Sequence, residues 1–159
     1  MDWKNLFLNA NGRIGQKDFW IGFLILFVVS FVVHFIPVLG QILWLVLIYP
    51  TVCLYSKRLH DFGKSGWLVL VPYAVLFLAL VIAVMFVGTA VLMGGASNLD
   101  TGAAAAGAVG GLMLAGLVGL AALLVCLGFL LWVGLSKGDP GPNRYGSPPL
   151  TAATATAVF

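Results

Sequence analysis

The chain contains no glutamate, and its 159 residues include only five acidic and eight Lys and Arg residues. Charged residues make up 8% of the sequence, whereas a soluble domain usually carries about 25%. Because 62% of the residues are hydrophobic, so few charges cannot cover a water-exposed surface. This deficit excludes a soluble domain and indicates a protein that is solvated mainly by lipid.

Cysteine is also scarce, and the basic residues are dispersed. Cys53 and Cys126 both lie inside apolar runs with no partner at metal-ligand spacing, so we interpret them as buried thiols that behave as small hydrophobes. No disulfide framework follows from two such residues. The net charge of +3 comes from short basic clusters between apolar runs, which excludes the broad basic patch that a nucleic-acid-binding face needs.

Long apolar runs dominate what remains. A helix needs about 20 apolar residues to cross the hydrocarbon core of a bilayer. The second run is short, but Lys57 can extend it because a lysine side chain reaches the headgroups. No small-x-small cleavage site follows the first run, which is therefore expected to be a retained anchor. We expect an all-α integral membrane domain over residues 1–150, with four spans at about residues 19–36, 41–57, 67–93 and 108–136.

The basic residues predict the orientation of these spans. With four crossings, the segment before the first span, the connection between the second and third, and the segment after the fourth all lie on one side. These three segments hold all eight basic residues, and the other side holds none. Since basic residues favour the cytoplasmic side, both termini are expected to be cytoplasmic.

The connections and ends differ in character. Trp3, Leu6 and Phe7 form a short apolar face, which predicts an interfacial N-terminal segment. Residues 57–66 are expected to form a polar loop, and residues 94–107 a loop of small residues. Residues 151–159 lack apolar periodicity and are expected to be disordered.

Small residues and prolines suggest how the helices pack. One stripe of small residues on the fourth span lets helix backbones approach closely, either within one chain or in a homo-oligomer; it consists of Gly107, Gly111, Ala115 and Gly119. Ala79 and Ala83 form a similar pair on the third span. Pro50 and Pro72 are expected to interrupt the second and third spans. Together with the short second span, these prolines favour an alternative function as a small transporter or channel component.

The polar residues gather in three segments that the topology places on one membrane face. Arginine presents a planar fork that matches phosphate, and a basic cluster at the cytoplasmic interface suits an anionic phospholipid headgroup. We therefore expect a binding site for such a headgroup, or for a partner protein, formed by Arg13, Arg58, His60, Asp61, Lys64, Ser65, Trp67, Asn143 and Arg144. A purely structural cluster, in which Arg58 pairs with Asp61 three residues later, remains the alternative.

Catalytic and metal chemistry have weaker support. His60 and Asp61 are adjacent, so their side chains point about 100° apart on a helix, which is awkward for a triad with Ser65. His34 is isolated near the opposite membrane face and is interpreted as a partly hydrated structural histidine. The sequence therefore predicts no catalytic residue, no metal site and no cofactor, with an enzyme using His60 and Asp61 as a further alternative.

Three motifs carry a family resemblance. They are the run RLHDFGKSGW from Arg58 to Trp67, the upstream Gly12-Arg13 followed by Phe19-Trp20, and the downstream GPNRYG at residues 141–146 with Pro148. Over roughly residues 3–149 the chain resembles the domain of unknown function 805 family of small bacterial inner-membrane proteins. The resemblance implies a four-helix membrane protein and no particular activity. The Ala/Gly-rich insert around residues 94–111 departs from that pattern.

Overall fold

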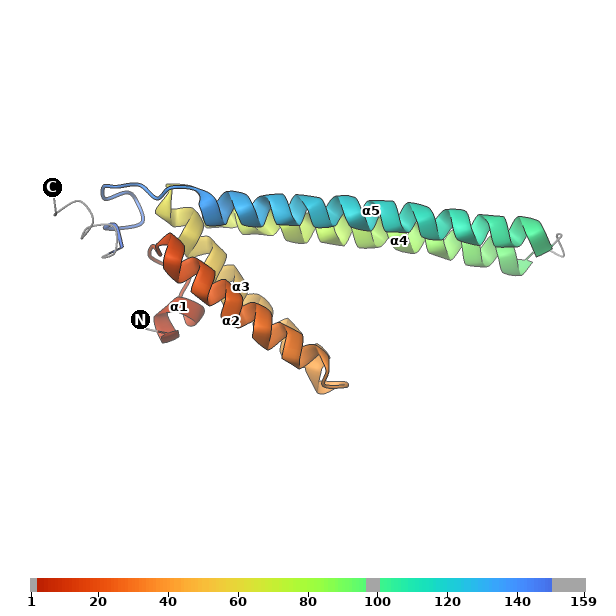
Figure 1. Cartoon of the computed structure of the whole chain (residues 1–159), viewed down its shortest axis with the longest axis horizontal. Helices are drawn as coiled ribbons and strands as arrows, with labels where there is room; N and C mark the ends of the chain where they lie inside the picture. The colour runs from red at the N-terminus through yellow and green to blue at the C-terminus, as the bar shows by residue number, and fades with distance from the viewer. Residues whose placement is uncertain (1–2, 97–100, 150–159) are drawn as a thin grey trace. The chain divides into compact units, whose positions relative to one another are not determined.

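A computed structural model of the chain describes residues 3–96 and 101–149, and within these residues it is helical, with no strand. Four of the described helices are long and apolar enough to cross a membrane, which confirms the expected fold class. In chain order the elements are α1 (Trp3–Leu8), α2 (Gln16–His34), α3 (Leu39–Asp61), the 3₁₀ turn η1 (Gly66–Val69), α4 (Leu70–Ala96) and α5 (Thr101–Leu135), as Figure 1 shows.

The chain forms two compact units. The first comprises Met1–Val69 and Leu131–Phe159, and the second comprises Leu70–Leu130. In the first unit α2 and α3 pack side by side, with α1 against α3. The second unit holds α4 and most of α5. The side chains of these helices whose burial is described are largely exposed, as expected for helices that face lipid.

Helix α3 extends further than the sequence predicted. It continues through Lys57 to Asp61, so the expected polar loop shrinks to residues 62–65. The chain turns away from the helix at Gly63, two residues after Asp61, where the φ of +69° suits glycine best. The N–H groups of Gly63 and Lys64 donate to the carbonyls of His60 and Leu59 at 3.2 and 2.9 Å, which is a Schellman motif. The last turn stays helical because its polar side chains are buried with partners, as described below.

The segment of small residues at 94–107 was also predicted wrongly as a loop. Helix α4 continues to Ala96 and α5 already begins at Thr101. Alanine is the best helix former, and the run of alanines after Gly102 therefore lengthens α5. The tail at 151–159 lies outside the described residues, so its disorder stays a prediction.

Pro50 and Pro72 lie in different helical contexts. Pro50 is inside α3, as expected. Pro72 is the third residue of α4, where an N–H has no partner within the helix, so Pro72 does not interrupt the helix. Helix α3 has 23 residues, so the second span is not short. Of the features that favoured a transport path, only Pro50 remains.

The stripe of small residues on α5 is divided between two environments. Gly111 is buried and Ala115 half-buried, whereas Gly107 and Gly119 are exposed. A homo-oligomeric interface along the stripe stays a prediction.

The N-terminal helix is fixed to the first unit by packing and by hydrogen bonds. Leu6 is buried, and a Cβ on Gly22 would approach its Cδ2 to 3.4 Å. Tyr49 donates its hydroxyl to the Leu8 carbonyl at 3.0 Å, and the Lys57 ammonium donates to Asn5. The short helix therefore has a fixed position on α3.

Gly134 sets the spacing between the end of α5 and α2. An added Cβ at Gly134 would lie 2.5 Å from Cζ2 of Trp20 and 3.3 Å from Cε1 of Phe19. We expect Gly134→Ala to lower the free energy of unfolding in detergent by about 1–3 kcal/mol, since overpacking forces rigid rings to move. Gly128→Ala is the matched control, because nothing lies within 4 Å of its added Cβ. Equal effects of the two substitutions would contradict this packing.

Candidate functional site

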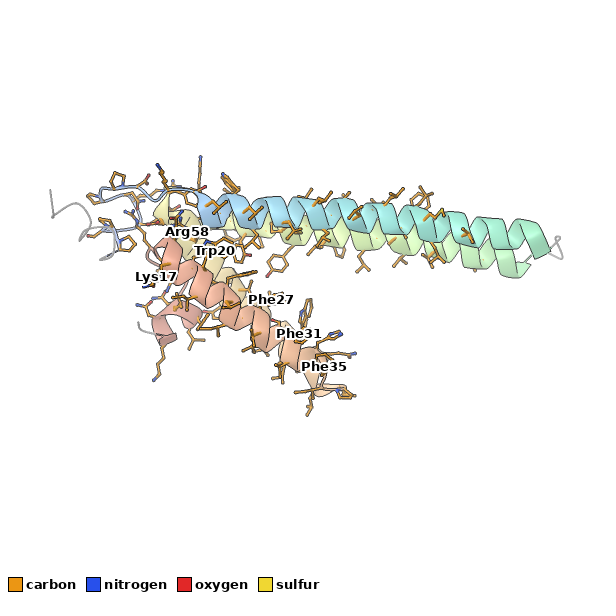
Figure 2. The ribbon with its side chains drawn as sticks, viewed as in Figure 1. Lys17, Trp20, Phe27, Phe31, Phe35 and Arg58 are labelled. Carbon is orange, nitrogen blue, oxygen red and sulfur yellow. The ribbon has the colours of Figure 1, made fainter. Side chains whose placement is uncertain are left out.

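Arg58, in the last turn of α3, is completely buried. Its Nε donates to the carbonyl of Val133 at 3.2 Å, and Nη1 donates to the carbonyl of Ile14 at 3.3 Å. Nη1 also pairs with the Asp61 carboxylate, and Nη2 donates to the Ser136 carbonyl. One side chain thus joins α3 to the residues before α2 and to the end of α5. Figure 2 shows Arg58 near Lys17, at the end of α2 and α3 opposite Phe35.

Arg13 approaches the same carboxylate from the segment before α2. Its Nε donates to Oδ1 of Asp61 at 3.1 Å, and its Nη2 donates to the Asp61 carbonyl at 3.1 Å. Further bonds reach the carbonyls of Asp139 at 2.6 Å, Gly141 at 2.8 Å and Gly146 at 3.2 Å. Arg13, Asp61 and Arg58 form a buried unit, which we call the ion triad.

The ion triad holds two positive charges and one negative charge in a buried place. Burying a charge is costly unless it is paired and its hydrogen bonds are satisfied. Backbone carbonyls supply the acceptors that Asp61 alone cannot provide. Within the part of the chain that the structure describes, no buried side-chain nitrogen or oxygen lacks a hydrogen-bond partner. The triad is therefore satisfied internally and has the geometry of a structural junction.

His60 faces away from the triad. Its Nδ1 lies 3.2 Å from the Gly12 carbonyl, which can only accept, so Nδ1 carries a proton. Its Nε2 lies 3.5 Å from Oγ of Ser56, and its ring stacks on Tyr145 with centroids 3.7 Å apart. The imidazole thus holds the C-terminal segment against α3.

These positions do not form a catalytic triad. Both oxygens of Asp61 accept from arginines, so this carboxylate does not orient His60. The hydroxyl at the imidazole belongs to Ser56, not Ser65. Among residues 3–96 and 101–149, no three His, Cys, Asp or Glu side chains gather as a possible metal site.

The segment after α5 returns across the end of α3. The Asp139 N–H donates to the Asp61 carbonyl at 2.8 Å. Asn143 donates through Nδ2 to the His60 carbonyl and to Asp139 Oδ2, each at 3.0 Å. An added Cβ on Gly138 would lie 2.1 Å from Asp61 Oδ2, so only glycine fits there. Asn143, expected as a ligand-binding residue, thus ties this segment to α3.

Four of the expected site residues lie at or near the surface. Lys64 and Arg144 are exposed, Ser65 is half-buried, and 79% of Trp67 is exposed. Arg144 donates through Nη2 to the Gly63 carbonyl at 3.2 Å, and its guanidinium lies 4.7 Å from the Tyr145 ring centroid. The predicted cluster therefore has a buried part around the ion triad and an exposed basic part.

Sequence reasoning missed several residues that complete this arrangement. Gln16 donates to the carbonyls of Leu135 and Ser136 at 2.9 and 3.2 Å, and Gly138 allows the close approach to Asp61. Gln16 lies three residues before the first apolar run, in a polar segment that the sequence shows. No sequence signal indicated the role of Gly138, because its contacts are with residues far away in the sequence.

Comparison with known proteins agrees with the motifs. The model of the family described as protein of unknown function (DUF805) matches residues 7–147, and the chain therefore belongs to that family. No curated protein and no solved structure matches the chain.

Asp61→Asn tests the ion triad. Removing the one carboxylate leaves Arg13 and Arg58 buried together without a counter-ion. We expect the free energy of unfolding in detergent to fall by about 3–5 kcal/mol, the usual cost of breaking a buried ion pair.

Asp18→Asn is the control, because Asp18 is a half-buried aspartate in the first turn of α2. Its loss should cost less than about 1 kcal/mol, the typical favourable effect of an acidic residue near a helix N-terminus. If Asp61→Asn were as mild as this control, the triad would not hold the unit together.

Proposed function

We propose that this member of the DUF805 family is a non-enzymatic multi-pass protein of a bacterial inner membrane that binds an anionic lipid headgroup on its cytoplasmic face. The binding surface is formed by Lys64 and Arg144, which we call the basic edge. Both termini are cytoplasmic in this proposal. It is supported by the distribution of basic residues and by the return of the C-terminal segment to the start of α2.

The observation that carries the proposal is the proximity of two exposed cations. The Gly63 carbonyl that accepts from Arg144 belongs to the peptide bond leading to Lys64. Both described ion pairs involve Asp61, so neither cation is neutralised by an ion pair there. The carboxylate of Asp139 lies close to Gly63, because its Oδ2 would be 3.1 Å from a Cβ added there. This oxygen accepts a hydrogen bond from Asn143.

The guanidinium of Arg144 is held in place while most of its donors remain available. It uses one nitrogen for the Gly63 carbonyl and stacks on Tyr145, which in turn stacks on His60. An arginine has five N–H donors in a rigid fork that matches phosphate oxygens. A preformed fork loses less conformational entropy on binding, which favours affinity.

The buried residues serve the basic edge indirectly. Arg13, Arg58 and Asp61 fix the two segments that carry Lys64 and Arg144, while His60 and Asn143 hold the C-terminal segment on α3. Ser65 and Trp67 follow Lys64 in the sequence. The exposed indole of Trp67 suits the headgroup level, where tryptophan is enriched.

The position of the basic edge near helix ends favours a lipid headgroup over a partner protein as its ligand. Lys64 follows the last turn of the membrane-spanning helix α3, and Arg144 is hydrogen-bonded to Gly63 beside it. Anionic headgroups attract basic residues at such helix ends. A partner protein that requires Lys64 and Arg144 is the alternative outcome of the binding test below.

The proposed topology predicts a labelling pattern in spheroplasts. A membrane-impermeant maleimide should react with Val38→Cys in intact spheroplasts, but with Lys64→Cys only after lysis. The unchanged chain gives the background from Cys53 and Cys126. Labelling of Lys64→Cys before lysis would contradict cytoplasmic placement of the basic edge.

Lipid retention tests the basic edge. Each basic residue near an anionic surface contributes about 1 kcal/mol, so Lys64→Ala or Arg144→Ala should lower retention of phosphatidylglycerol about fivefold. The double variant should lower it about thirtyfold. Native mass spectrometry of the full chain, purified from vesicles containing this lipid, measures the retained fraction.

Lys137→Ala is the matched control, since Lys137 is also exposed and follows α5 directly. Its retention of the anionic lipid should equal that of the unchanged chain. Equal losses in all three variants would mean that diffuse charge, not the basic edge, attracts the lipid. No loss in the double variant would overturn the proposal, and a protein partner lost with the same two residues would replace it.

A further inference from the structure

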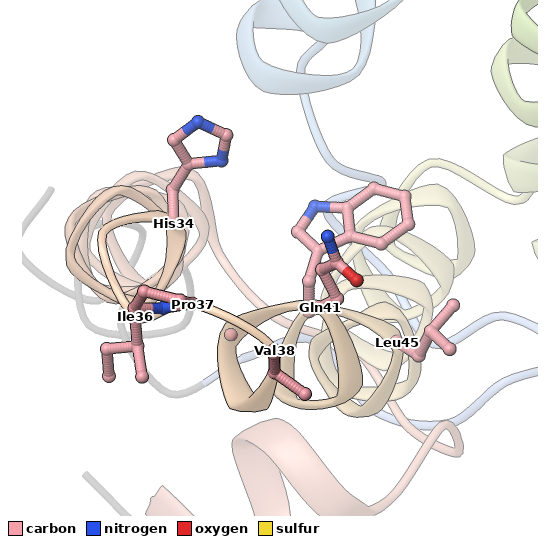
Figure 3. A pocket seen from close by; sticks show the side chains of 8 residues that line it. His34, Ile36, Pro37, Val38, Gln41 and Leu45 are labelled. Atoms are coloured by element: carbon pink, nitrogen blue, oxygen red, sulfur yellow. The ribbon is translucent and has the colours of Figure 1, made fainter.

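A cavity opens at the turn between α2 and α3, at the end of this helix pair opposite the ion triad (Figure 3). Its volume is about 580 Å³, within the range of about 300–1,000 Å³ that is typical of ligand pockets. The lining is mainly apolar and includes Pro37, Val38 and Leu45. We call it the turn cavity.

Three polar side chains from both helices also line the turn cavity. His34 is the last residue of α2, and Gln41 and Trp44 lie in the first two turns of α3. Figure 3 shows His34 and Gln41 projecting on the same side of the turn. All three are exposed, and their side chains make no hydrogen bond to any residue in the described part of the chain. An apolar pocket with a few convergent polar groups is the usual form of a small-molecule site.

The backbone of the turn is constrained around this cavity. Val38 has φ of +61°, which is strongly disfavoured for a β-branched residue. Gly40 is buried, and an added Cβ would lie 2.2 Å from the Val33 carbonyl oxygen. Strained conformations persist where the surrounding structure enforces them, and they cluster at ligand sites. The end of α2 and the start of α3 are therefore held at a fixed position relative to each other.

The chemistry of the lining defines the ligand. No Asp, Glu, Lys or Arg lines the cavity, so it offers no counter-charge to an ion. The indole of Trp44 can only donate a hydrogen bond, and the amide of Gln41 brings two further donors. The matching ligand groups are uncharged acceptors such as carbonyl oxygens. Because the cavity lies at the ends of membrane-spanning helices, an apolar body attached to these acceptors would extend into the bilayer.

We propose that the turn cavity binds the glycerol-ester region of a diacyl lipid with no net charge. The ester carbonyls accept hydrogen bonds from Gln41 and Trp44. His34 lines the cavity beside these two donors. The start of an acyl chain packs on Pro37, Val38 and Leu45. Donors left unpaired at the edge of hydrocarbon are costly, and the lipid esters supply their partners. This site is independent of the basic edge.

Replacing the ester linkages of the lipid tests this assignment. The full chain is placed in nanodiscs of diacyl phosphatidylethanolamine or of its dialkyl ether analogue, which lacks the ester carbonyls. Native mass spectrometry then measures the lipid retained after transfer to detergent. We expect the diacyl lipid to be retained about thirtyfold more than the ether lipid, the effect of two hydrogen bonds of about 1 kcal/mol each.

Gln41→Leu and Trp44→Phe should each reduce the preference for the diacyl lipid, and the two substitutions together should abolish it, because each removes one donor while keeping much of the side-chain volume. Thr89→Val is the control, since it removes a hydroxyl on α4 that bonds only within its own helix. The double variant Lys64→Ala/Arg144→Ala should retain the preference, so failure here and failure at the basic edge are distinguishable. Equal retention of both lipids, or a preference that survives the two cavity substitutions together, would overturn the proposal.

Discussion

The structure depends on a buried carboxylate that two arginines share. The single negative charge of Asp61 cannot neutralise both Arg13 and Arg58. Their guanidinium groups therefore also donate to backbone carbonyls in the segment before α2, at the end of α5 and in the loop after it. Because buried charges must be satisfied, these segments are drawn to one place. The polar end of α3 is therefore the junction of the first unit, although most of its surroundings are apolar.

Burial divides the basic residues into two groups with different roles. Arg13 and Arg58 donate their hydrogen bonds to groups inside the protein. If they bound a ligand instead, buried carbonyls would be left without a donor. Lys64 and Arg144 keep their charge at the surface. Residue type alone does not separate the groups, because each contains an arginine that lies in one of the three family motifs. A rigid buried junction beside an exposed cationic edge is the arrangement that a preorganised anion site requires.

The sequence predicted the four spans, the Arg58–Asp61 pair and the motifs that identify the family, because apolar run length and helical spacing are local properties. It did not predict that α3 reaches Asp61, since the partners that keep this turn helical come from residues 13–14 and 133–146. It also could not assign His60, whose orientation depends on Gly12 and Tyr145. The sequence did not predict the turn cavity, because His34 and Gln41 line one cavity only when the turn brings the two helix ends together.

The contacts of Arg13 also imply an order of assembly during synthesis. Arg13 and Arg58 find their acceptors at Gly141 and Ser136, which are 128 and 78 residues further along the chain. While α5 has not yet entered the membrane, the acceptors for Arg13 and Arg58 are Asp61 and the carbonyl of Ile14. When α2 and α3 first pair, some N–H donors of Arg13 and Arg58 therefore have no acceptor. The end of α5 and the segment after it supply these acceptors later. A chain shortened before Ser136 would keep its four spans but would lack the carbonyl acceptors of Ser136, Asp139 and Gly141.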